Sequence, residues 1–241
     1  MKRIDEREFS QIRPHKFTKN FVRNPRGSVL IECGNTRVIC TATVEHRAPR
    51  WMKEQGKSGG WITAEYQMMP GSGGRRIPRR TNGRSTEIQR LIGRSLRAAV
   101  DLTLLGDNTI TIDCDVLDAD GGTRCASING GLIALRLALN DMFVCEEIPT
   151  IPMDEFVGAI SVGIVDGIPM SDLCYEEDSA AEVDMNVVMT EGGRFIEVQG
   201  TAEKEPFSIE QMNAMLNLAH GSIGEIITLQ RECLSVYHDQ K

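Results

Sequence analysis

The stretch Thr109-Ile-Thr-Ile-Asp-Cys-Asp-Val-Leu-Asp-Ala-Asp-Gly-Gly-Thr-Arg124 contains a strand, a glycine turn and the start of a helix. Apolar residues occupy every second position from Ile110 to Val116, which is the period of a half-buried β-strand. The paired glycines Gly121 and Gly122 follow, and an apolar segment from about Cys125 to Phe143 predicts a long helix. This order predicts a strand-to-helix connection that lets the backbone approach a ligand closely.

Three further pairs of strands are predicted around short turn signals. Each pair has β-rich residues on both sides of a glycine-containing turn, the pattern of a β-hairpin. The predicted strands, with their turns, are Ser28–Cys33 and Thr36–Val44 around Gly34-Asn35, Ala159–Val165 and Ile168–Leu173 around Asp166-Gly167, and Val183–Thr190 and Arg194–Thr201 around Glu191-Gly192-Gly193.

Two more helices complete the predicted order. Apolar residues from Ile88 to Ala99 recur at helical spacing, and Arg84 directly precedes this helix. Ser208 and Gln211 form a capping box that opens a long helix to about Leu234. We predict an α/β protein of the α+β type, a single domain over residues 1–241 with its core at about 10–235. Each half resembles a hairpin-rich sheet followed by a helix, the pattern of a duplicated unit.

Charge divides the chain sharply. Residues 1–136 hold 23 basic and 14 acidic side chains, a net charge of +9, whereas residues 137–241 hold 4 basic and 20 acidic ones, a net charge of −16. A basic half favours a polyanionic partner, and an acidic half favours a metal or acid–base role, unless the two halves neutralise each other or another subunit. The 7 scattered cysteines exclude a zinc or disulfide framework. Neither a secretory signal nor a membrane-spanning run is apparent, so we expect a cytoplasmic protein.

Arginine is concentrated in one segment. Eight of the 20 arginines lie between Arg75 and Arg97, and the first of them fall in a Gly- and Pro-rich stretch that excludes regular structure. Guanidinium groups bind phosphate oxygens bidentately, so this loop favours contact with a nucleic-acid backbone. A solubilising surface loop is the alternative. The candidate RNA-binding residues are Arg75, Arg76, Arg79 and Arg80.

The glycine turn at Asp120–Arg124 is a candidate phosphate site. Gly121 and Gly122 permit a concave run of N–H groups, Thr123 offers a hydroxyl and Arg124 a positive charge. Arg84, at the start of another predicted helix, is a second anion-binding candidate. The turn is not a Walker A loop, because no Gly-Lys-Ser/Thr follows it.

Carboxylates gather between Asp172 and Asn186. Ser179 and Glu182 fit a capping box, which gives Glu182 a structural task. Asp184 and Asn186 are two apart on a strand and share a face. Asp178 and Asp184 are therefore candidate magnesium ligands, since Mg²⁺ takes one or two carboxylates and keeps several waters. An ordinary acidic surface patch is the alternative.

These motifs resemble the ribonuclease PH family of phosphate-dependent 3′-to-5′ exoribonucleases. The resemblance runs from about residue 10 to residue 235. The matching stretches are Gly27–Glu32, Gly60–Tyr66, Glu87–Leu102, Asp113–Arg124, Ser161–Val165, Tyr175–Thr190 and Ile196–Glu203.

The resemblance implies a function for each candidate residue. Arg84, Gly122, Thr123 and Arg124 would bind inorganic phosphate as co-substrate. Asp178 and Asp184 would hold Mg²⁺ or assist at the leaving oxygen, and with Arg84 and Arg124 they would form the catalytic group. The loop arginines would grip the 3′ end of transfer RNA or another structured RNA. The family also implies a homo-hexameric ring, a trimer of dimers, and gives no reason to expect a DNA or membrane partner.

Three other functions compete with this interpretation. A non-catalytic ring subunit of an exosome-like assembly would be expected to lose phosphate or metal residues, which this chain retains. Polynucleotide phosphorylase carries two such domains and further modules, which 241 residues cannot hold. A hydrolytic two-metal nuclease would need a denser carboxylate cluster.

Overall fold

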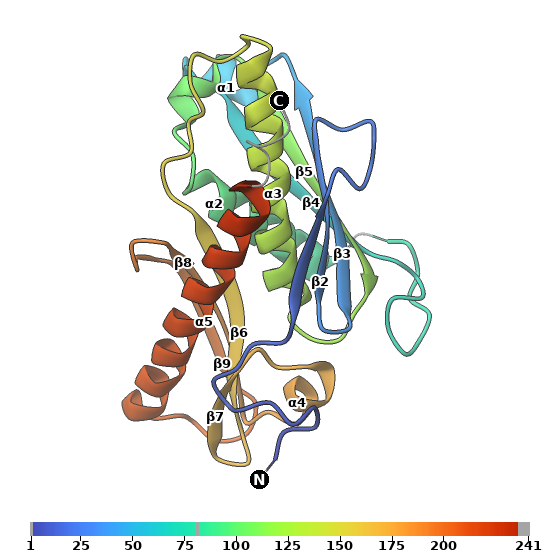
Figure 1. The fold of residues 1–241 in the computed structure, drawn as a ribbon, viewed down its shortest axis with the longest axis vertical. Coiled ribbons are helices and arrows are strands. Elements are labelled where there is room, and N and C mark those ends of the chain that lie inside the picture. The colour runs from blue at the N-terminus through green and yellow to red at the C-terminus, as the bar shows by residue number, and fades with distance from the viewer. Residues whose placement is uncertain (1, 81, 236–241) are drawn as a thin grey trace.

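The computed structural model describes residues 2–80 and 82–235. Within them the chain forms two β-sheets with helices between and beside them (Figure 1). The predicted α/β class with antiparallel hairpins is confirmed.

The first sheet has five strands in the order β1-β2-β3-β5-β4. Neighbours pair antiparallel except β4 and β5, which run parallel. Parallel neighbours need a crossover connection, and α2 provides it here. The strands are β1 (His15–Lys19), β2 (Gly27–Cys33), β3 (Thr36–Glu45), β4 (Trp61–Met68) and β5 (Thr109–Asp118).

The second sheet has four antiparallel strands in the order β7-β6-β8-β9. Every residue of strand β6 is buried, because helices α3 and α5 pack against this strand. The strands are β6 (Val157–Val165), β7 (Ile168–Ser171), β8 (Val183–Thr190) and β9 (Phe195–Ala202).

Helix α3 (Thr123–Val144) lies between the two sheets and contacts β2, β3 and β6 (Figure 1). It is apolar nearly all round and buried along most of its length, as expected of a helix with no solvent face. Asn129 on α3 binds the backbone of β6, receiving the Ala159 N–H at 2.8 Å and donating to the Ala159 carbonyl at 2.9 Å. A Cβ on Gly130 would lie 2.8 Å from the Cys40 Sγ, so α3 packs closely on β3.

The other two long helices pack beside α3. Helix α2 (Gly83–Arg97) packs on β4 and on α3, and α5 (Ile209–Ser235) packs mainly on β6 and β7. The Ser208–Gln211 capping box is confirmed, with the Ser208 N–H donating to Gln211 Oε1 at 2.8 Å and the Gln211 N–H to Ser208 Oγ at 3.3 Å. The shorter elements are α1 (Arg50–Glu54), the 3₁₀ helix η1 (Leu102–Leu105) and α4 (Tyr175–Ala180).

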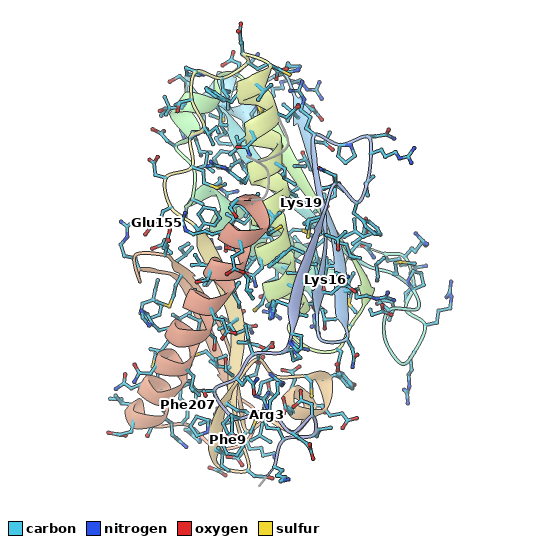
Figure 2. The ribbon with its side chains drawn as sticks, in the orientation of Figure 1. Arg3, Phe9, Lys16, Lys19, Glu155 and Phe207 are labelled. Atoms are coloured by element: carbon cyan, nitrogen blue, oxygen red, sulfur yellow. The ribbon has the colours of Figure 1, made fainter. Side chains whose placement is uncertain are left out.

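The segment before β1 crosses to the second sheet. Arg3 and Phe9 lie at the end of the molecule that carries β7 and α4 (Figure 2). Phe9 packs on a small apolar cluster of Val165, Met170, Leu173 and Ala181 that is separate from the main core. The start of the chain therefore contacts the half of the protein farthest from it in sequence.

Several elements differ from the sequence-based prediction. Strands β1 and β4 and helix α1 were not predicted, because they lie in segments rich in charged residues, Gly and Pro. The three predicted hairpins, strand β5 and the three long helices are present. All seven cysteines lie in the described residues and are free. None of the helices in residues 2–80 and 82–235 has the length and apolar character needed to cross a membrane.

Candidate active site

A cavity of about 600 Å³ opens where the first turns of α2 and α3 meet α4 and β8. It brings together all six candidate residues for phosphate, metal and catalysis, from segments up to 100 positions apart. The lining residues are Met68, Gly73, Gly74, Arg75, Arg84, Ala119, Gly121, Gly122, Thr123, Arg124, Ser161, Tyr175, Asp178, Asp184 and Asn186.

The glycine turn forms one wall of this cavity. Gly121 and Gly122 both have left-handed φ angles, +74° and +65°, which other L-residues rarely adopt. A Cβ on Gly121 would lie 2.4 Å from the Leu173 carbonyl oxygen, so no larger residue fits there. Helix α3 begins at Thr123, and the first N–H groups of a helix have no acceptor within it. The turn and helix start thus offer backbone donors to an anion.

The hydroxyl of Thr123 is held by a hydrogen bond with Tyr66. Tyr66 Oη, at the end of β4, lies 2.9 Å from Thr123 Oγ1, and both side chains are buried. Burial raises the pKa of the Tyr66 phenol, so it stays neutral and can donate this bond. Strand β4 was missed in the sequence, and this contact depends on it.

Two guanidinium groups face the cavity from different helices. Arg84 lies in the first turn of α2 rather than before it, because Asn82 caps this helix by accepting the Ser85 N–H at 2.8 Å. Its side chain is exposed and makes no hydrogen bond within the described residues. Arg124, in the first turn of α3, donates to Gln199 Oε1 at 2.7 Å. The guanidinium of Arg84 is thus free to bind an anion, whereas that of Arg124 is oriented by its hydrogen bond to Gln199.

The two carboxylates lie opposite these cations. Asp178 is on α4 and Asp184 on β8. Burial raises the pKa of Asp178, while Arg84 and Arg124 oppose the rise. The pKa of Asp184 is raised to about 6, first by burial and then by repulsion from Asp178. Asp178 and Asp184 repel each other, and the attraction of Arg84 and Arg124 only partly offsets this repulsion. A cation bound between the two carboxylates would therefore be stabilised.

Helix α4 differs from the prediction in its boundaries. The expected capping box of Ser179 and Glu182 is wrong, because α4 ends at Ala180, before Glu182. Ser179 Oγ instead donates to the Glu176 carbonyl at 3.0 Å, and Glu182 accepts the Gly167 N–H at 3.2 Å. Glu177 closes the helix start by accepting the Cys174 N–H at 3.0 Å. Asp178 therefore lies within the helix.

The carboxylate pair fits a magnesium ion. Asp184 Oδ1 is buried and has no hydrogen-bond partner among the described residues, which leaves one oxygen free as a ligand. Nowhere in the described part of the chain do three His, Cys, Asp or Glu side chains gather as a metal cage. Magnesium does not need one, since it binds one or two carboxylates with waters and substrate phosphates.

The predicted arginine loop is irregular and projects from the first sheet (Figure 1). Of its four candidate residues only Arg75 lines the cavity. Arg76, Arg79 and Arg80 are exposed, and within the described residues none of the four makes a hydrogen bond or ion pair. The loop therefore holds exposed cations at and around the cavity mouth, and one of the four, Arg79, acts on the carboxylate of Asp115 through its charge.

Two further cavity residues fall within the matching stretches Ser161–Val165 and Tyr175–Thr190 but were not singled out as site candidates. Ser161 on β6 is 3% exposed, and its hydroxyl has no partner among the described residues. Tyr175, 62% exposed, stands at the start of α4, and its N–H donates to Asp120 Oδ1 at 3.1 Å. Neither lies in a motif with its own spacing, and only the pairing of the two halves brings them to the glycine turn.

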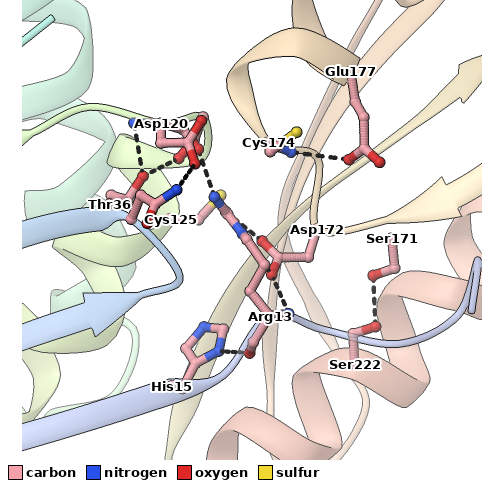
Figure 3. Close-up of polar contacts among 12 residues, drawn as sticks. Arg13, His15, Thr36, Asp120, Cys125, Ser171, Asp172, Cys174, Glu177 and Ser222 are labelled. Carbon is pink, nitrogen blue, oxygen red and sulfur yellow. Dashed lines mark hydrogen bonds and ion pairs between the residues drawn. The ribbon is translucent and has the colours of Figure 1, made fainter. Parts of the chain in front are cut away.

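Behind the glycine turn lies a buried ion pair (Figure 3). Arg13 Nη2 is 2.6 Å from Asp172 Oδ1, and Arg13 Nη1 donates to the Asp120 carbonyl at 2.5 Å. Although burial raises the pKa of Asp172, the bonds from Arg13 bring it below its usual value. Asp172 is therefore ionised at neutral pH.

Comparison with known families identifies the fold. The model of the 3′ exoribonuclease family, domain 1, matches residues 11–139. The chain belongs to the 3′ exoribonuclease (RNase PH) family. The model for domain 2 of this family matches residues 155–222. The first match includes Arg84 and Arg124, and the second includes Asp178 and Asp184.

Solved structures share this RNase PH fold. An Archaeoglobus fulgidus exosome with RNA bound to the active site is similar, with a TM-score of 0.82 and 20% identity over 94% of this chain and 92% of that one. Rice (Oryza sativa) Rrp46 has a TM-score of 0.80 and 20% identity over 97% and 100%. An archaeal exosome core has a TM-score of 0.77 and 20% identity over 96% and 90%.

Proposed function

We propose that this RNase PH-family protein is a phosphorolytic 3′-to-5′ exoribonuclease that trims the 3′ ends of transfer RNA precursors. The observation that carries the proposal is the meeting, in one cavity, of two guanidinium groups, a glycine turn at a helix start and a carboxylate pair. A site for phosphorolysis has to hold two anions close together, the attacking phosphate and the scissile phosphodiester. The donors on one wall and the carboxylates on the other suit that task.

In the proposed reaction, an oxygen of inorganic phosphate attacks the 3′-terminal phosphorus in line. The bond from that phosphorus to the 3′ oxygen of the preceding nucleotide breaks, and this oxygen takes up a proton. The products are a nucleoside 5′-diphosphate and an RNA shorter by one nucleotide. The reverse reaction adds nucleotides from diphosphates. No covalent enzyme intermediate is needed.

Each residue has a distinct task in this proposal. Arg84, Arg124 and the N–H groups after Gly122 bind the attacking phosphate and offset its repulsion from the RNA. Thr123, fixed by Tyr66, supplies one more hydrogen bond. Asp178 and Asp184 would hold Mg²⁺, which would stabilise the charge that develops on the transferring phosphoryl group. The loop arginines grip the RNA backbone.

The proposed partners follow from the fold. The similar structures include exosome cores, one of them with RNA bound at its active site. By analogy we propose that this chain forms a homo-hexameric ring, a trimer of dimers, in the cytoplasm. Its substrates would be the 3′ ends of transfer RNA and of other structured RNA.

The second candidate function is that of a non-catalytic ring subunit. The fold is similar to rice Rrp46 and to archaeal exosome cores at 20% identity, and so low an identity does not separate active from inactive members. Retention of both guanidinium groups and both carboxylates in the cavity favours the enzyme.

A single assay separates these functions. A transfer RNA precursor is incubated with the protein and magnesium, with and without inorganic phosphate, and the released nucleotide is identified. Diphosphate released only with phosphate is the expected result. Monophosphate released without phosphate would mean hydrolysis and would refute the proposal. RNA binding with no product in either condition would identify a ring subunit.

A further inference from the structure

The buried ion pair of Arg13 and Asp172 is made of unusually many contacts. Besides the Nη2 contact, Asp172 Oδ2 accepts the Arg13 Nε–H at 3.0 Å and the Arg13 backbone N–H at 2.7 Å. Arg13 is 4% exposed and Asp172 is 2% exposed. Asp172 also has a left-handed φ of +53°, which a non-glycine residue adopts only when its surroundings enforce it. The pair is thus rigid and shielded from water.

This pair supports the glycine turn directly. Arg13 Nη1 holds the carbonyl of Asp120, the residue before Gly121. Arg13 Nη2 lies 3.1 Å from the point where a Cβ on Gly122 would be, so the guanidinium fills the space behind that glycine. The backbone of the turn is therefore supported by one guanidinium group.

The same pair is attached to the carboxylate side of the cavity. The Asp172 N–H donates to the Ser161 carbonyl at 2.7 Å, and the chain then passes through Leu173, whose carbonyl touches Gly121, to α4 and Asp178. The carboxylate of Asp120 accepts the Tyr175 N–H in the first turn of α4. Both walls of the cavity are therefore fastened to one ion pair.

The segment before β1 strengthens this attachment. Arg3 forms a bidentate pair with Glu177, next to Asp178, at 2.8 and 2.7 Å, and donates to the Ser171 and Asp172 carbonyls at 2.8 and 3.0 Å. Arg7 Nη2 also donates to the Asp172 carbonyl, at 3.1 Å. These contacts fix the Asp172–Glu177 segment from a second side.

Neither Arg13 nor Asp172 is among the residues that line the cavity. They do not contact a ligand bound there, and they act on it through the residues they hold. The charge of Arg13 also reaches Asp178, where it works against the rise in the pKa of that carboxyl. We propose that Arg13 and Asp172 are positioning residues that set the glycine turn at a fixed distance from α4, so that phosphate bound on the turn meets the carboxylate pair. This inference rests on the proposed phosphorolytic function and names residues that the family match does not assign.

The test uses the full-length protein with two substitutions, Asp172→Asn and Arg13→Lys. The first keeps the shape of the side chain but removes its charge. The second keeps the charge but cannot reach Asp172 and the Asp120 carbonyl together. A displacement of about 1 Å in a catalytic group costs roughly 100-fold in rate, so a partial shift of the turn is expected to raise the KM for phosphate about tenfold. The KM for RNA is expected to stay unchanged.

This split distinguishes positioning from a general loss of stability. A variant that merely unfolds in part lowers the amount of active protein and the apparent kcat, and it leaves both KM values unchanged. The control is Arg26→Gln, which breaks another bidentate pair, with Glu147 at 2.7 and 2.8 Å, away from the cavity. It is expected to lower the melting temperature without a change in the KM for phosphate.

An unchanged KM for phosphate in Arg13→Lys, with active wild-type protein, would overturn the inference. Arg13→Lys decides the matter alone if Asp172→Asn does not fold, because it retains a cation opposite Asp172. Wild-type protein that releases no diphosphate would instead refute the proposed function. In that case titration calorimetry with inorganic phosphate still tests the positioning pair, since weaker binding in Arg13→Lys supports it and equal binding refutes it.

Discussion

Tyr66 Oη lies 2.9 Å from Thr123 Oγ1, and this buried contact joins the end of β4 to the first residue of α3. Tyr66→Phe would leave the Thr123 hydroxyl without this partner. We expect the free energy of unfolding to fall by about 1–2 kcal/mol and the KM for phosphate to rise a few-fold. Denaturant titration and steady-state kinetics measure the two effects. Tyr175→Phe, which changes an exposed ring, is the control for stability alone because Tyr175 lines the cavity, and an equal loss of stability there would contradict the assignment.

Arg84 is the exposed guanidinium in the first turn of α2. Arg84→Ala removes a charged donor from the proposed phosphate site, where such bonds contribute about 1.5–3 kcal/mol. The KM for phosphate is therefore expected to rise by about 10- to 150-fold. Arg90→Ala, on the same helix and also exposed, is the matched control because Arg90 does not line the cavity. Equal effects of the two variants would remove Arg84 from the site.

Asp184 makes stability depend on pH. Its pKa in the folded protein is about 6, above the reference value of 3.8, so its contribution to stability is present below about pH 3.8 and is lost as pH rises through 6. The Asp184→Asn variant does not lose this stability, because asparagine does not titrate. Without magnesium, its free energy of unfolding at pH 7.5 should exceed that of wild type by about 1–3 kcal/mol, and the two should converge near pH 4. Denaturant titrations at both pH values test this, with exposed Asp154→Asn as control.

At the proposed magnesium site, the same group would make metal binding depend on pH. Magnesium binds the ionised carboxylate, so protonation of Asp184 below about pH 6 competes with it. We expect the dissociation constant for Mg²⁺, measured by calorimetry on the RNA-free protein, to rise about tenfold for each pH unit below 6. A constant that stays the same between pH 7.5 and 5 would exclude Asp184 as a ligand.

Three loop arginines are expected to bind the RNA backbone without contacting the inorganic phosphate. The triple variant Arg76→Gln, Arg79→Gln, Arg80→Gln should raise the KM for RNA. Each lost phosphate contact to a single strand should also reduce the slope of log affinity against log salt by about 0.7. The KM for inorganic phosphate should stay as in wild type. A salt slope identical to that of wild type would show that these residues do not contact the RNA backbone.

The elements that the sequence predicted are those with strong local signals. Asp166 and Gly167 both adopt left-handed φ angles, +49° and +73°, as their hairpin signal requires. Strand β4 carried a signal too, because Ile62, Ala64 and Tyr66 alternate and are buried. This short signal is obscured by the glycines and basic residues on either side of it. The strand is also stabilised by parallel pairing with β5, which lies more than 40 residues away in the sequence and leaves no local pattern.

The candidate site was predictable where function itself demands a local pattern. Arg84 and Arg124 each start a helix, and Asp178 and Asp184 stand in one acidic run, so residue type and position both indicated them. Arg13 gave no such signal, since its partner Asp172 is 159 residues away and only the crossing of the first segment to the second sheet unites them. The residues proposed to bind phosphate and metal are visible in the sequence, whereas Arg13, proposed to position the glycine turn, is not.

Helix α3 is buried between two sheets, and only one of them precedes it in the chain. Until β6 is made, the surface of the helix that β6 will cover has no partner within the chain. A chain stopped near residue 150 would therefore present that apolar surface to chaperones and to other nascent chains. The first half of this protein therefore cannot bury its own long helix without strands from the second half.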